Sequence, residues 1–364
     1  MSESDSSKVA ETARILDWEK KAMSGVTDPY LREQLEKRRE ELKTTISVLP
    51  AEEASAAATP LVDLLHEVDN AVQRMDDGTY GICAGCQGTV EKERLIADPL
   101  VRLCLDCLSD EEQRALERDL ELASHIQRGL LPQTDLRFRD WRIHYHYKPA
   151  GIVSGDYCDL IQPSAADGKL IFLLGDVSGK GIAASLLMTH LHAMFRSLAG
   201  VGLNLEKLLE IANRLFCEST TASQYATLIC GSIGRNGEVE IASAGHSPAL
   251  LVSRAGVKKI GATGLPLGLF TSSSYSVSRA RLDLDDTLLL FTDGISEARC
   301  AAGGEFGIDA LCLAAARRHG WAPEELVAAC LRDVDKHSEG TRQADDQTLM
   351  AIQRSAAAAA SFND

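Results

Sequence analysis

Four aspartates in the C-terminal two thirds of the chain each lie near one end of a short apolar run. The clearest cases are Asp176, after the apolar run 170–174, and Asp293, after the run 288–291. Short apolar runs bounded by turn residues are typical of buried strands, so these carboxylates are expected to point into one cleft. Buried unpaired carboxylates are costly, whereas hard divalent cations bind several at once. The pattern predicts bound Mg²⁺ or Mn²⁺ among Asp156, Asp176, Asp293 and Asp345.

The order of apolar patterns after about residue 140 predicts an α+β sandwich. Short strands separated by glycine-rich turns are interrupted by two helical stretches, 183–198 and 204–218. A last helix near 323–334 precedes a terminal strand at 348–352. Further strands are expected at 226–232, 239–243, 249–253 and 288–291. This order fits a sandwich better than a βαβ array, in which single strands and helices would alternate.

Ten cysteines divide into one tight cluster and six scattered single residues. The cluster consists of two C-x-x-C pairs separated by the seventeen residues 87–103, a spacing found in zinc ribbons. Four thiolates leave zinc no open position, so one structural ion is predicted, with a redox dithiol pair as the alternative. The predicted ligands are Cys83, Cys86, Cys104 and Cys107. Thiols used in this way indicate a reducing compartment.

Two amphipathic helices are predicted before the cysteines. Asp28 and Thr59, each followed by proline, have the pattern of helix starts. Apolar residues at helical spacing form one stripe within 31–46 and another within 61–75. Because only the short segment 51–58 separates them, the helices should pair as an antiparallel hairpin that buries both stripes. The cysteine finger would close the open end of this hairpin.

The hairpin and cysteine pairs resemble the DksA/TraR zinc-finger family over roughly residues 28–108. The resemblance also includes the step from Tyr80 to Cys83 and the pair Arg94-Leu95. It implies a four-cysteine zinc site, and members of this family reach into the secondary channel of RNA polymerase with acidic residues at the hairpin tip. Here the tip offers Glu52 and Glu53 without paired aspartates. An interaction or sensing module is therefore the preferred interpretation.

Ser109 and Glu112 have the spacing of a capping box, and no helix breaker follows before Gln127. A single helix is therefore expected to lead from the cysteine finger to the sandwich. Its apolar residues follow a four-three spacing: Leu116, Leu120, Ala123 and Leu130. This short stripe suits either a homodimer seam or packing on the following domain, and the spacing does not decide between them.

Charge and hydropathy exclude two classes of partner. The chain of 364 residues carries a formal net charge of −15. Neither direct nucleic-acid binding nor binding to an anionic membrane is expected, since both require a basic surface. The apolar runs are far shorter than the roughly 20 residues that span a bilayer, and the polar start shows no signal-peptide core. The protein is expected to be cytoplasmic.

The C-terminal two thirds resemble the SpoIIE-type branch of the metal-dependent serine/threonine protein phosphatases, the PPM superfamily. Six motifs occur in family order across roughly residues 120–354, and together they are far more specific than any one alone. The motifs are 153–157 (VSGDY), 175–181 (GDVSGKG), 244–248 (AGHSP), 264–268 (GLPLG), 292–298 (TDGISEA) and 345–348 (DDQT). The helix 120–132 resembles the one that leads into this domain.

The phosphatase resemblance implies a four-layer α-β-β-α sandwich with a binuclear Mg²⁺ or Mn²⁺ centre between the sheets. Carried over by position, Asp176 would bridge both ions with help from the Val177 carbonyl. Asp156, Asp293 and Asp345 would complete the protein ligands. The neighbouring Asp346 and Asp159 rank lower, as residues near the ligands. His246 is expected to be a hydrogen-bonded structural histidine rather than a substrate contact.

These patterns predict five segments. They are a polar N-terminal segment (1–27), the helical hairpin with its zinc finger (28–108), a helical linker (109–131), the phosphatase domain (132–354) and a disordered tail (355–364).

The leading functional hypothesis is a protein-serine/threonine phosphatase regulated by the zinc module. The resemblance suggests an anti-sigma-factor antagonist as its phosphorylated substrate. The alternative is a regulator that binds RNA polymerase through the zinc hairpin. A purely structural dimeric scaffold would leave the acidic constellation without a reason.

Overall fold

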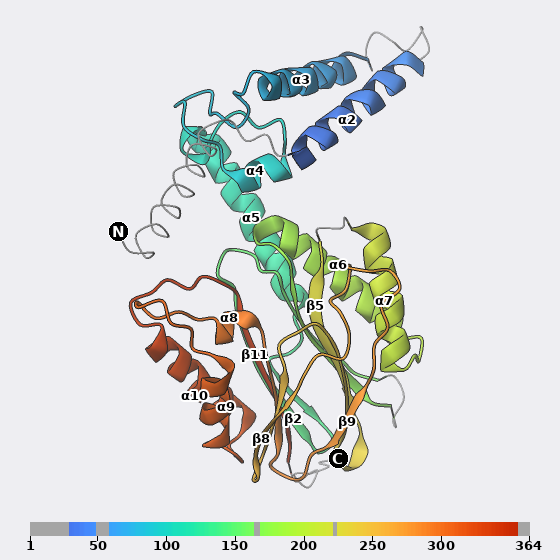
Figure 1. Cartoon of the computed structure of the whole chain (residues 1–364), viewed down its shortest axis with the longest axis vertical. Helices are drawn as coiled ribbons and strands as arrows, with labels where there is room; N and C mark the ends of the chain where they lie inside the picture. Colours follow the sequence, from blue (N-terminus) through green and yellow to red (C-terminus); the bar gives the residue numbers. More distant parts are fainter. Residues whose placement is uncertain (1–28, 49–57, 164–167, 221–223, 356–364) are drawn as a thin grey trace, which may run out of the picture. The chain divides into compact units, whose positions relative to one another are not determined.

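The computed structural model describes residues 29–48, 58–163, 168–220 and 224–355 (Figure 1). The chain divides into two compact units, Met1–Arg118 and Asp119–Asp364. Several sequence predictions lie outside the described residues: the segment 1–27, the cap at Asp28, the tip residues Glu52 and Glu53, and the tail from residue 356. Among the described helices, none is long and apolar enough to cross a membrane.

The first unit begins with the predicted helical hairpin. Helix α2 (Pro29–Val48) pairs with α3 (Ala58–Asp76), and their apolar stripes share one core. Arg32 Nη2 lies 2.7 Å from Asp76 Oδ1, and Arg39 Nη1 lies 3.9 Å from Asp69 Oδ1. The start of one helix therefore faces the end of the other, so the antiparallel pairing is confirmed. The core of the hairpin also includes Tyr80 and the buried Cys83 and Cys104.

After the short helix α4 (Lys92–Ala97) and the 3₁₀ turn η1 (Leu105–Cys107), the chain enters α5 (Asp110–Leu130). The predicted capping box is present at its start. The Ser109 amide donates to Glu112 Oε2 over 2.9 Å, and the Glu112 amide donates to Ser109 Oγ over 3.3 Å. Each side chain satisfies an amide that the first helical turn leaves free. Helix α5 crosses the boundary between the two units.

The second unit contains two antiparallel sheets. One has the order β1-β2-β11-β10-β7-β8 and the other the order β3-β4-β5-β6-β9. The strands of the first are β1 (Asp135–Phe138), β2 (Trp141–Lys148), β11 (Gln347–Arg354), β10 (Thr287–Phe291), β7 (Ala249–Ser253) and β8 (Gly256–Ile260). Those of the second are β3 (Asp156–Ile161), β4 (Leu170–Val177), β5 (Ala226–Ile233), β6 (Glu238–Ala244) and β9 (Ser278–Arg281).

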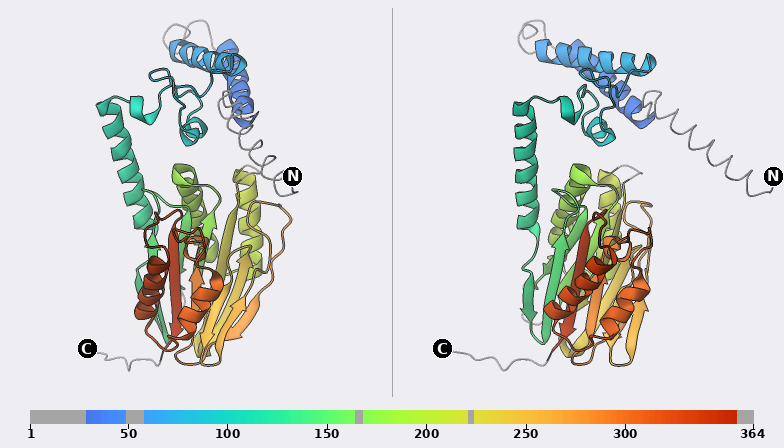
Figure 2. Two further views of the ribbon diagram at one scale, coloured as in Figure 1. Left: turned by 60° about the vertical axis from the view of Figure 1, so that its left-hand side comes forward. Right: turned by 90° about the vertical axis from the view of Figure 1, so that its left-hand side faces the viewer.

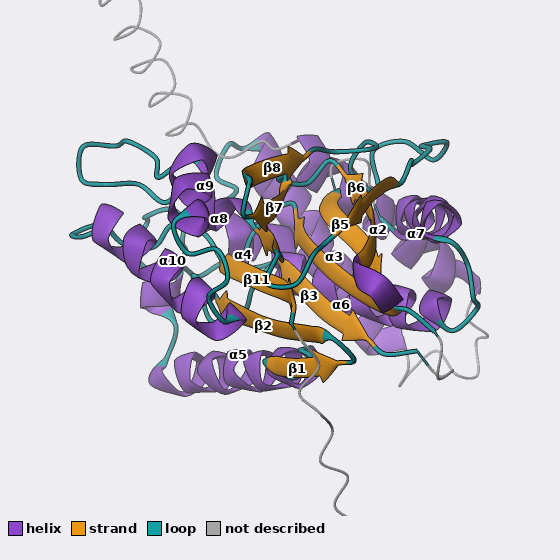
Figure 3. Ribbon diagram, turned by 90° about the horizontal axis from the view of Figure 1, so that it is seen from below, coloured by secondary structure: helices purple, strands orange, loops and turns teal. Residues whose placement is uncertain are grey.

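Helices cover the outer face of each sheet (Figures 2 and 3). Helices α6 (Gly181–Ala199) and α7 (Leu205–Ser219) pack on the five-stranded sheet, and α9 (Ile308–Ala316) and α10 (Pro323–His337) pack on the six-stranded sheet. Three apolar cores separate the four layers. The predicted α+β sandwich is confirmed. Helix α9 was not predicted, because its nearly continuous apolar sequence shows little helical periodicity.

The core between the sheets changes character along the strands. Side chains alternate between the two faces of a strand, so Cys158, Leu174 and Ile229 all point between the sheets. Continuing the same alternation toward one end places Asp156, Asp176 and Thr227 in that space. The inter-sheet core is thus apolar over most of its length and polar at the end that holds the predicted acids.

Candidate functional site

Two of the predicted acids lie side by side on neighbouring strands. Asp156 begins β3, Asp176 lies near the end of β4, and the two residues face each other in the antiparallel register. Asp156 is 1% exposed. Gly155 permits the close approach of this turn, because a β-carbon there would lie 3.2 Å from the Val177 carbonyl oxygen and 3.4 Å from Asp176 Oδ1. The Val177 carbonyl and the Asp176 carboxylate therefore border the same small space.

The other two acids approach from the opposite sheet. Asp293 begins the short helix α8 (Asp293–Ser296) after β10, and Asp345 precedes β11. Gly294 brings these segments together, since a β-carbon there would collide with the carbonyl oxygen of Asp346. Residues separated by about fifty positions are thus held in backbone contact.

The acids interact across the gap between the sheets. Burial, followed by the charges of Asp293, Asp345 and Asp346, raises the pKa of Asp176 to about 7. Burial and then Asp345 raise the pKa of Asp293. Burial and then Asp176 raise the pKa of Asp156 well above its usual value. Like charges in a desolvated site disfavour ionisation, and bound cations would relieve this cost.

Two hydroxyl groups orient Asp156. Thr292 Oγ1 donates to Asp156 Oδ2 over 2.9 Å, and the Thr348 hydroxyl donates to the same oxygen. Both threonines are buried and belong to the six-stranded sheet side of the site. One carboxylate oxygen is therefore satisfied by the protein. No local sequence pattern marks these threonines as partners of Asp156, although the alternation within β11 places Thr348 on the same face as Met350.

Lys180 supplies the nearest cationic group. Its Nζ lies 2.9 Å from Asp345 Oδ2 and donates to the Ala344 carbonyl over 2.8 Å. The Lys180 side chain remains 65% exposed. Lys180, Asp345 and Asp346 line a pocket of about 410 Å³ that also includes Arg342 and Ile182. Asp345 and Asp346 therefore border an open pocket that also holds a lysine and an arginine.

The two lower-ranked acids have different surroundings. Asp346 accepts hydrogen bonds from the amides of Ala150 (2.7 Å) and Gly155 (2.9 Å), which fixes the loop before Asp156. Asp159 points to the other face of β3. It is fully buried, and Arg196 of α6 donates two hydrogen bonds of 2.8 and 2.6 Å to it. Asp346 therefore belongs to the acidic site, whereas Asp159 fastens a helix to the sheet.

His246 connects the sheets close to the acids. Its Nδ1 lies 2.8 Å from Thr227 Oγ1, and its Nε2 lies 3.2 Å from the Phe291 carbonyl oxygen. Burial lowers the pKa of His246 to about 4, so the ring is neutral at neutral pH. The expected hydrogen-bonded histidine is confirmed.

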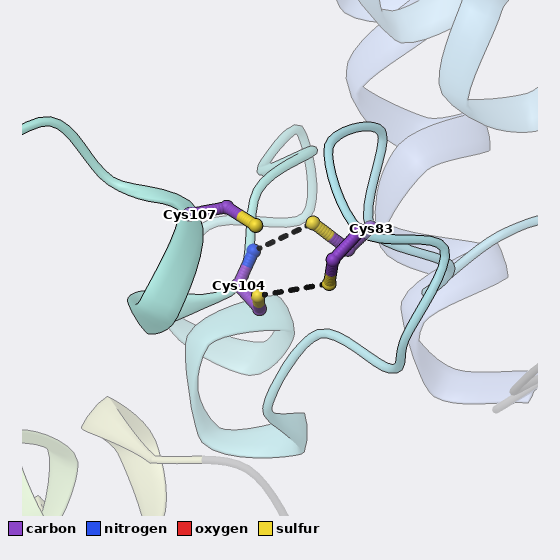
Figure 4. Close-up of side chains that lie close together, drawn as sticks. Cys83, Cys104 and Cys107 are labelled. Atoms are coloured by element: carbon purple, nitrogen blue, oxygen red, sulfur yellow. Dashed lines mark hydrogen bonds between the residues drawn. The ribbon is translucent and has the colours of Figure 1, made fainter.

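The four cysteines of the first unit come together, and Figure 4 labels three of them, Cys83, Cys104 and Cys107. Their sulfur atoms all lie within 4.8 Å of one another. The Cys104 amide points at Cys83 Sγ over 3.3 Å, and hydrogen bonding from Cys104 and Cys86 lowers the pKa of the Cys83 thiol to about 6. Burial raises the pKa of Cys104, and the Cys86 thiol raises the pKa of Cys107 to about 12. Backbone amides aimed at sulfur favour the thiolate, the form that binds metal.

The four cysteines and the four aspartates differ in how closely their ligand atoms gather. Among the described residues, the cysteines are the one group of three or more His, Cys, Asp or Glu side chains that meets this 4.8 Å limit. Within the described part of the chain, the four aspartates do not form a group that meets this limit.

Comparison with known proteins agrees with both parts of the chain. The family profile "Stage II sporulation protein E (SpoIIE)" matches residues 166–355, more than half of the chain. The chain belongs to the SpoIIE family. A second profile, "Prokaryotic dksA/traR C4-type zinc finger", matches residues 78–113, which include the four cysteines. Both predicted resemblances are therefore confirmed.

Relatives of this SpoIIE-family chain include two proteins of Bacillus subtilis. It is 27% identical to "Phosphoserine phosphatase RsbU" over 194 residues, covering 52% of this chain and 57% of RsbU. It is 30% identical to "Phosphoserine phosphatase RsbP" over 187 residues, covering 50% of this chain and 46% of RsbP. The chain spans about half the length of the curated relatives it matches.

A solved structure supports the fold. The SiaA-PP2C domain of Pseudomonas aeruginosa superimposes with a TM-score of 0.59 at 18% identity, covering 66% of this chain and 98% of that domain. The sandwich is therefore the PP2C-type phosphatase fold.

Proposed function

We propose that the protein is a metal-dependent phosphatase that hydrolyses phosphoserine or phosphothreonine in a protein substrate. The observation that carries the proposal is the gathering of Asp156, Asp176, Asp293 and Asp345 at the polar end of the sandwich. Membership of the SpoIIE family and similarity to two proteins named phosphoserine phosphatase support it. The catalytic domain would comprise residues 132–354.

The donor set fits two Mg²⁺ or Mn²⁺ ions. Hard oxygen ligands and mutually repelling carboxylates match the preference of these cations. The four aspartates and the Val177 carbonyl would hold them, with Asp176 shared between both. When bound, such ions lower the pKa of a coordinated water and offset charge on phosphoryl oxygens.

Other residues would prepare the site. Thr292 and Thr348 hold Asp156 in one orientation through its Oδ2 atom. Asp346 fixes the preceding loop through the amides of Ala150 and Gly155. Lys180 and Arg342 place positive charge in the pocket beside Asp345, where a dianionic phosphate ester and its flanking peptide would enter.

An anti-sigma-factor antagonist is the proposed phosphoprotein, and the cytoplasm is the proposed compartment. The resemblance to the SpoIIE branch suggests a substrate of this kind, and similarity to two proteins named phosphoserine phosphatase supports phosphoserine as the group it carries. Zinc is the ion proposed for the cysteines, because four clustered thiols with amide donors suit it. The zinc module and helix 109–131 would regulate the phosphatase. The stripe of Leu116, Leu120, Ala123 and Leu130 on this helix would form the seam of a homodimer.

RNA polymerase binding is the weaker candidate function. The zinc-finger match at 78–113 favours it, but that match covers the cysteine loops and not the hairpin tip. A polymerase pull-down with the full chain would decide it.

The test of the phosphatase proposal is hydrolysis of a chromogenic phosphate ester with Mn²⁺. Asp176→Asn and Asp345→Asn should each reduce turnover by at least about a hundredfold, because each removes a charge that holds the ions. Asp309→Asn is the matched control, since Asp309 is exposed, pairs with Lys259 and does not line the pocket beside Asp345. Wild-type rates in both site variants would refute the proposal.

A further inference from the structure

Strand β4, which carries Asp176, and strand β10, which ends two residues before Asp293, belong to different sheets, and His246 joins the two sheets. The imidazole lies between Thr227 of β5 in the five-stranded sheet and Phe291 at the end of β10 in the six-stranded sheet. Thr227 is the register partner of Asp176, and Phe291 comes two residues before Asp293. The ring therefore spans the gap between the sheets at the level of the acids.

The hydrogen bonds fix the state of the ring. The Phe291 carbonyl can only accept, so Nε2 must carry the proton that is donated to it. Nδ1 is then left as an acceptor, and the Thr227 hydroxyl donates to it. Both ring nitrogens are satisfied by one neutral tautomer. His246 is 6% exposed, so neither bond competes with bulk water.

We propose that His246 is a positioning residue for the metal-binding acids, whose bridge from Thr227 to Phe291 sets the distance between Asp176 and Asp293. The inference rests on the proposed phosphatase function and names a residue on which the acidic site depends. Among the described residues, His246 hydrogen-bonds to Thr227 and Phe291 and to none of the four aspartates. It would therefore act through the two strands and would not contact substrate.

Metal affinity is the property that such a bridge controls. Coordination distances tolerate changes of only about 0.2 Å, so ligands on two separate sheets must be held at a fixed spacing. Loss of a group that orients metal ligands typically lowers affinity by about 10- to 100-fold. A residue that served stability alone would lower the melting temperature and leave the affinity of the folded protein unchanged.

A natural control lies at the other end of the same sheets. Trp141 Nε1 donates to the Gly234 carbonyl over 2.8 Å, and this bond also joins the six-stranded to the five-stranded sheet. Trp141 pairs with Arg354, whereas Lys148 at the opposite end of β2 pairs with Gln347, next to Asp346. Trp141→Phe thus removes a buried bond between the sheets far from the acids.

Three variants of the full chain separate a role in positioning the metal ligands from a role in stability alone. His246→Gln keeps an amide that can donate to the Phe291 carbonyl, whereas His246→Asn reaches only toward Thr227. Thr227→Val removes the hydroxyl with little change of shape. Mn²⁺ affinity would be measured by titration calorimetry, and folding by thermal melting without metal.

We expect His246→Asn to weaken Mn²⁺ binding by at least about tenfold. Thr227→Val should weaken it less, and His246→Gln should recover part of the affinity. Trp141→Phe should lower the melting temperature while Mn²⁺ affinity stays within about twofold of wild type. Because Thr227→Val and His246→Gln are mild changes, the test survives even where His246→Asn fails to fold.

Unchanged Mn²⁺ affinity in the folded His246 and Thr227 variants would overturn the inference. In that case wild type would still bind Mn²⁺ and hydrolyse phosphate esters, so the proposed function would stand. A wild-type protein that neither binds Mn²⁺ nor hydrolyses esters would instead refute the proposed function itself.

Discussion

The four cysteines and the four aspartates bring mutually repelling ligands together by opposite means. The cysteines come from two loops within residues 83–107, and their sulfur atoms lie within 4.8 Å of one another. The aspartates are spread over residues 156–345 and come from both sheets of the sandwich. The first set is held by short loops and backbone amides, the second by the packing of an entire domain.

This difference determines what each region should lose without metal. The cysteine loops place Tyr80, Val90 and Leu95 in a core that they share with the hairpin, and binding of an ion would add its own free energy to this packing. The sandwich has three apolar cores that do not involve the acids. Removal of metal should therefore unfold the cysteine finger. The sandwich should stay folded, with its carboxylates repelling one another.

The largest predicted effect concerns the cysteines. Chelation of zinc, or Cys104→Ser at a buried ligand, should remove on the order of 10 kcal/mol of binding free energy and unfold residues 78–108. Hydrogen exchange should show loss of amide protection there, with protection of the sandwich unchanged. Cys312→Ser, outside the cluster, is the control. Retained protection after zinc removal would show that the loops fold without the ion.

A smaller effect of opposite sign is predicted for Asp176 without metal. Its pKa is raised from 3.8 to about 7, so the folded chain keeps this proton over a range in which the unfolded chain has lost it. Stability should therefore fall as pH rises from about 4 to about 7. Asp176→Asn lacks this penalty and should stabilise the metal-free sandwich at pH 8 by on the order of 3 kcal/mol.

Urea unfolding at pH 5 and pH 8 would measure the Asp176 effect. The gain should shrink at the lower pH, and Mn²⁺ should no longer stabilise the variant as it does wild type. A metal-free Asp176→Asn protein that is less stable than wild type at pH 8 would contradict the picture of crowded acids.

The smallest predicted effect concerns the capping box that follows the cysteines and its contribution to the stability of α5. Ser109→Ala removes the hydroxyl of the capping box at the start of α5 and should cost about 1 kcal/mol. Amide exchange at the first turn of α5 would report it. Ser197→Ala, which removes an exposed hydroxyl bonded to a helix carbonyl, should change exchange far less. Equal effects would mean that the box contributes nothing specific.

Local signals in the sequence predicted much of the structure. The cysteine spacing, the capping box and the stripes of the hairpin each depend on neighbours within a few turns, and each is present as expected. Helices α6, α7 and α10 begin and end within a few residues of their predicted bounds. The apolar run before Asp176 correctly indicated β4, because a continuous apolar segment of that length is typical of a strand buried on both faces.

What escaped prediction depends on which strand lies next to which. Asp159 and Asp346 were ranked together from sequence, yet the alternation of β3 turns Asp159 toward Arg196 while a separate loop brings Asp346 to the acids. The donors to Asp156 come from residues 292 and 348, far along the chain. No local pattern specifies such partners. The ligand roles of the aspartates stay a prediction.

The position of Asp156 opposite Asp176 also bears on how the domain folds. A slip of one residue in β3 would turn Asp156 toward the helix side and carry Tyr157 into the inter-sheet core. Only molecules with the correct register of β3 would then hold Asp156 beside Asp176. A divalent cation that binds the aligned acids would stabilise the correct register of β3 and β4 over the slipped one by mass action. The acids would then favour correct folding of the domain as well as hold the metal.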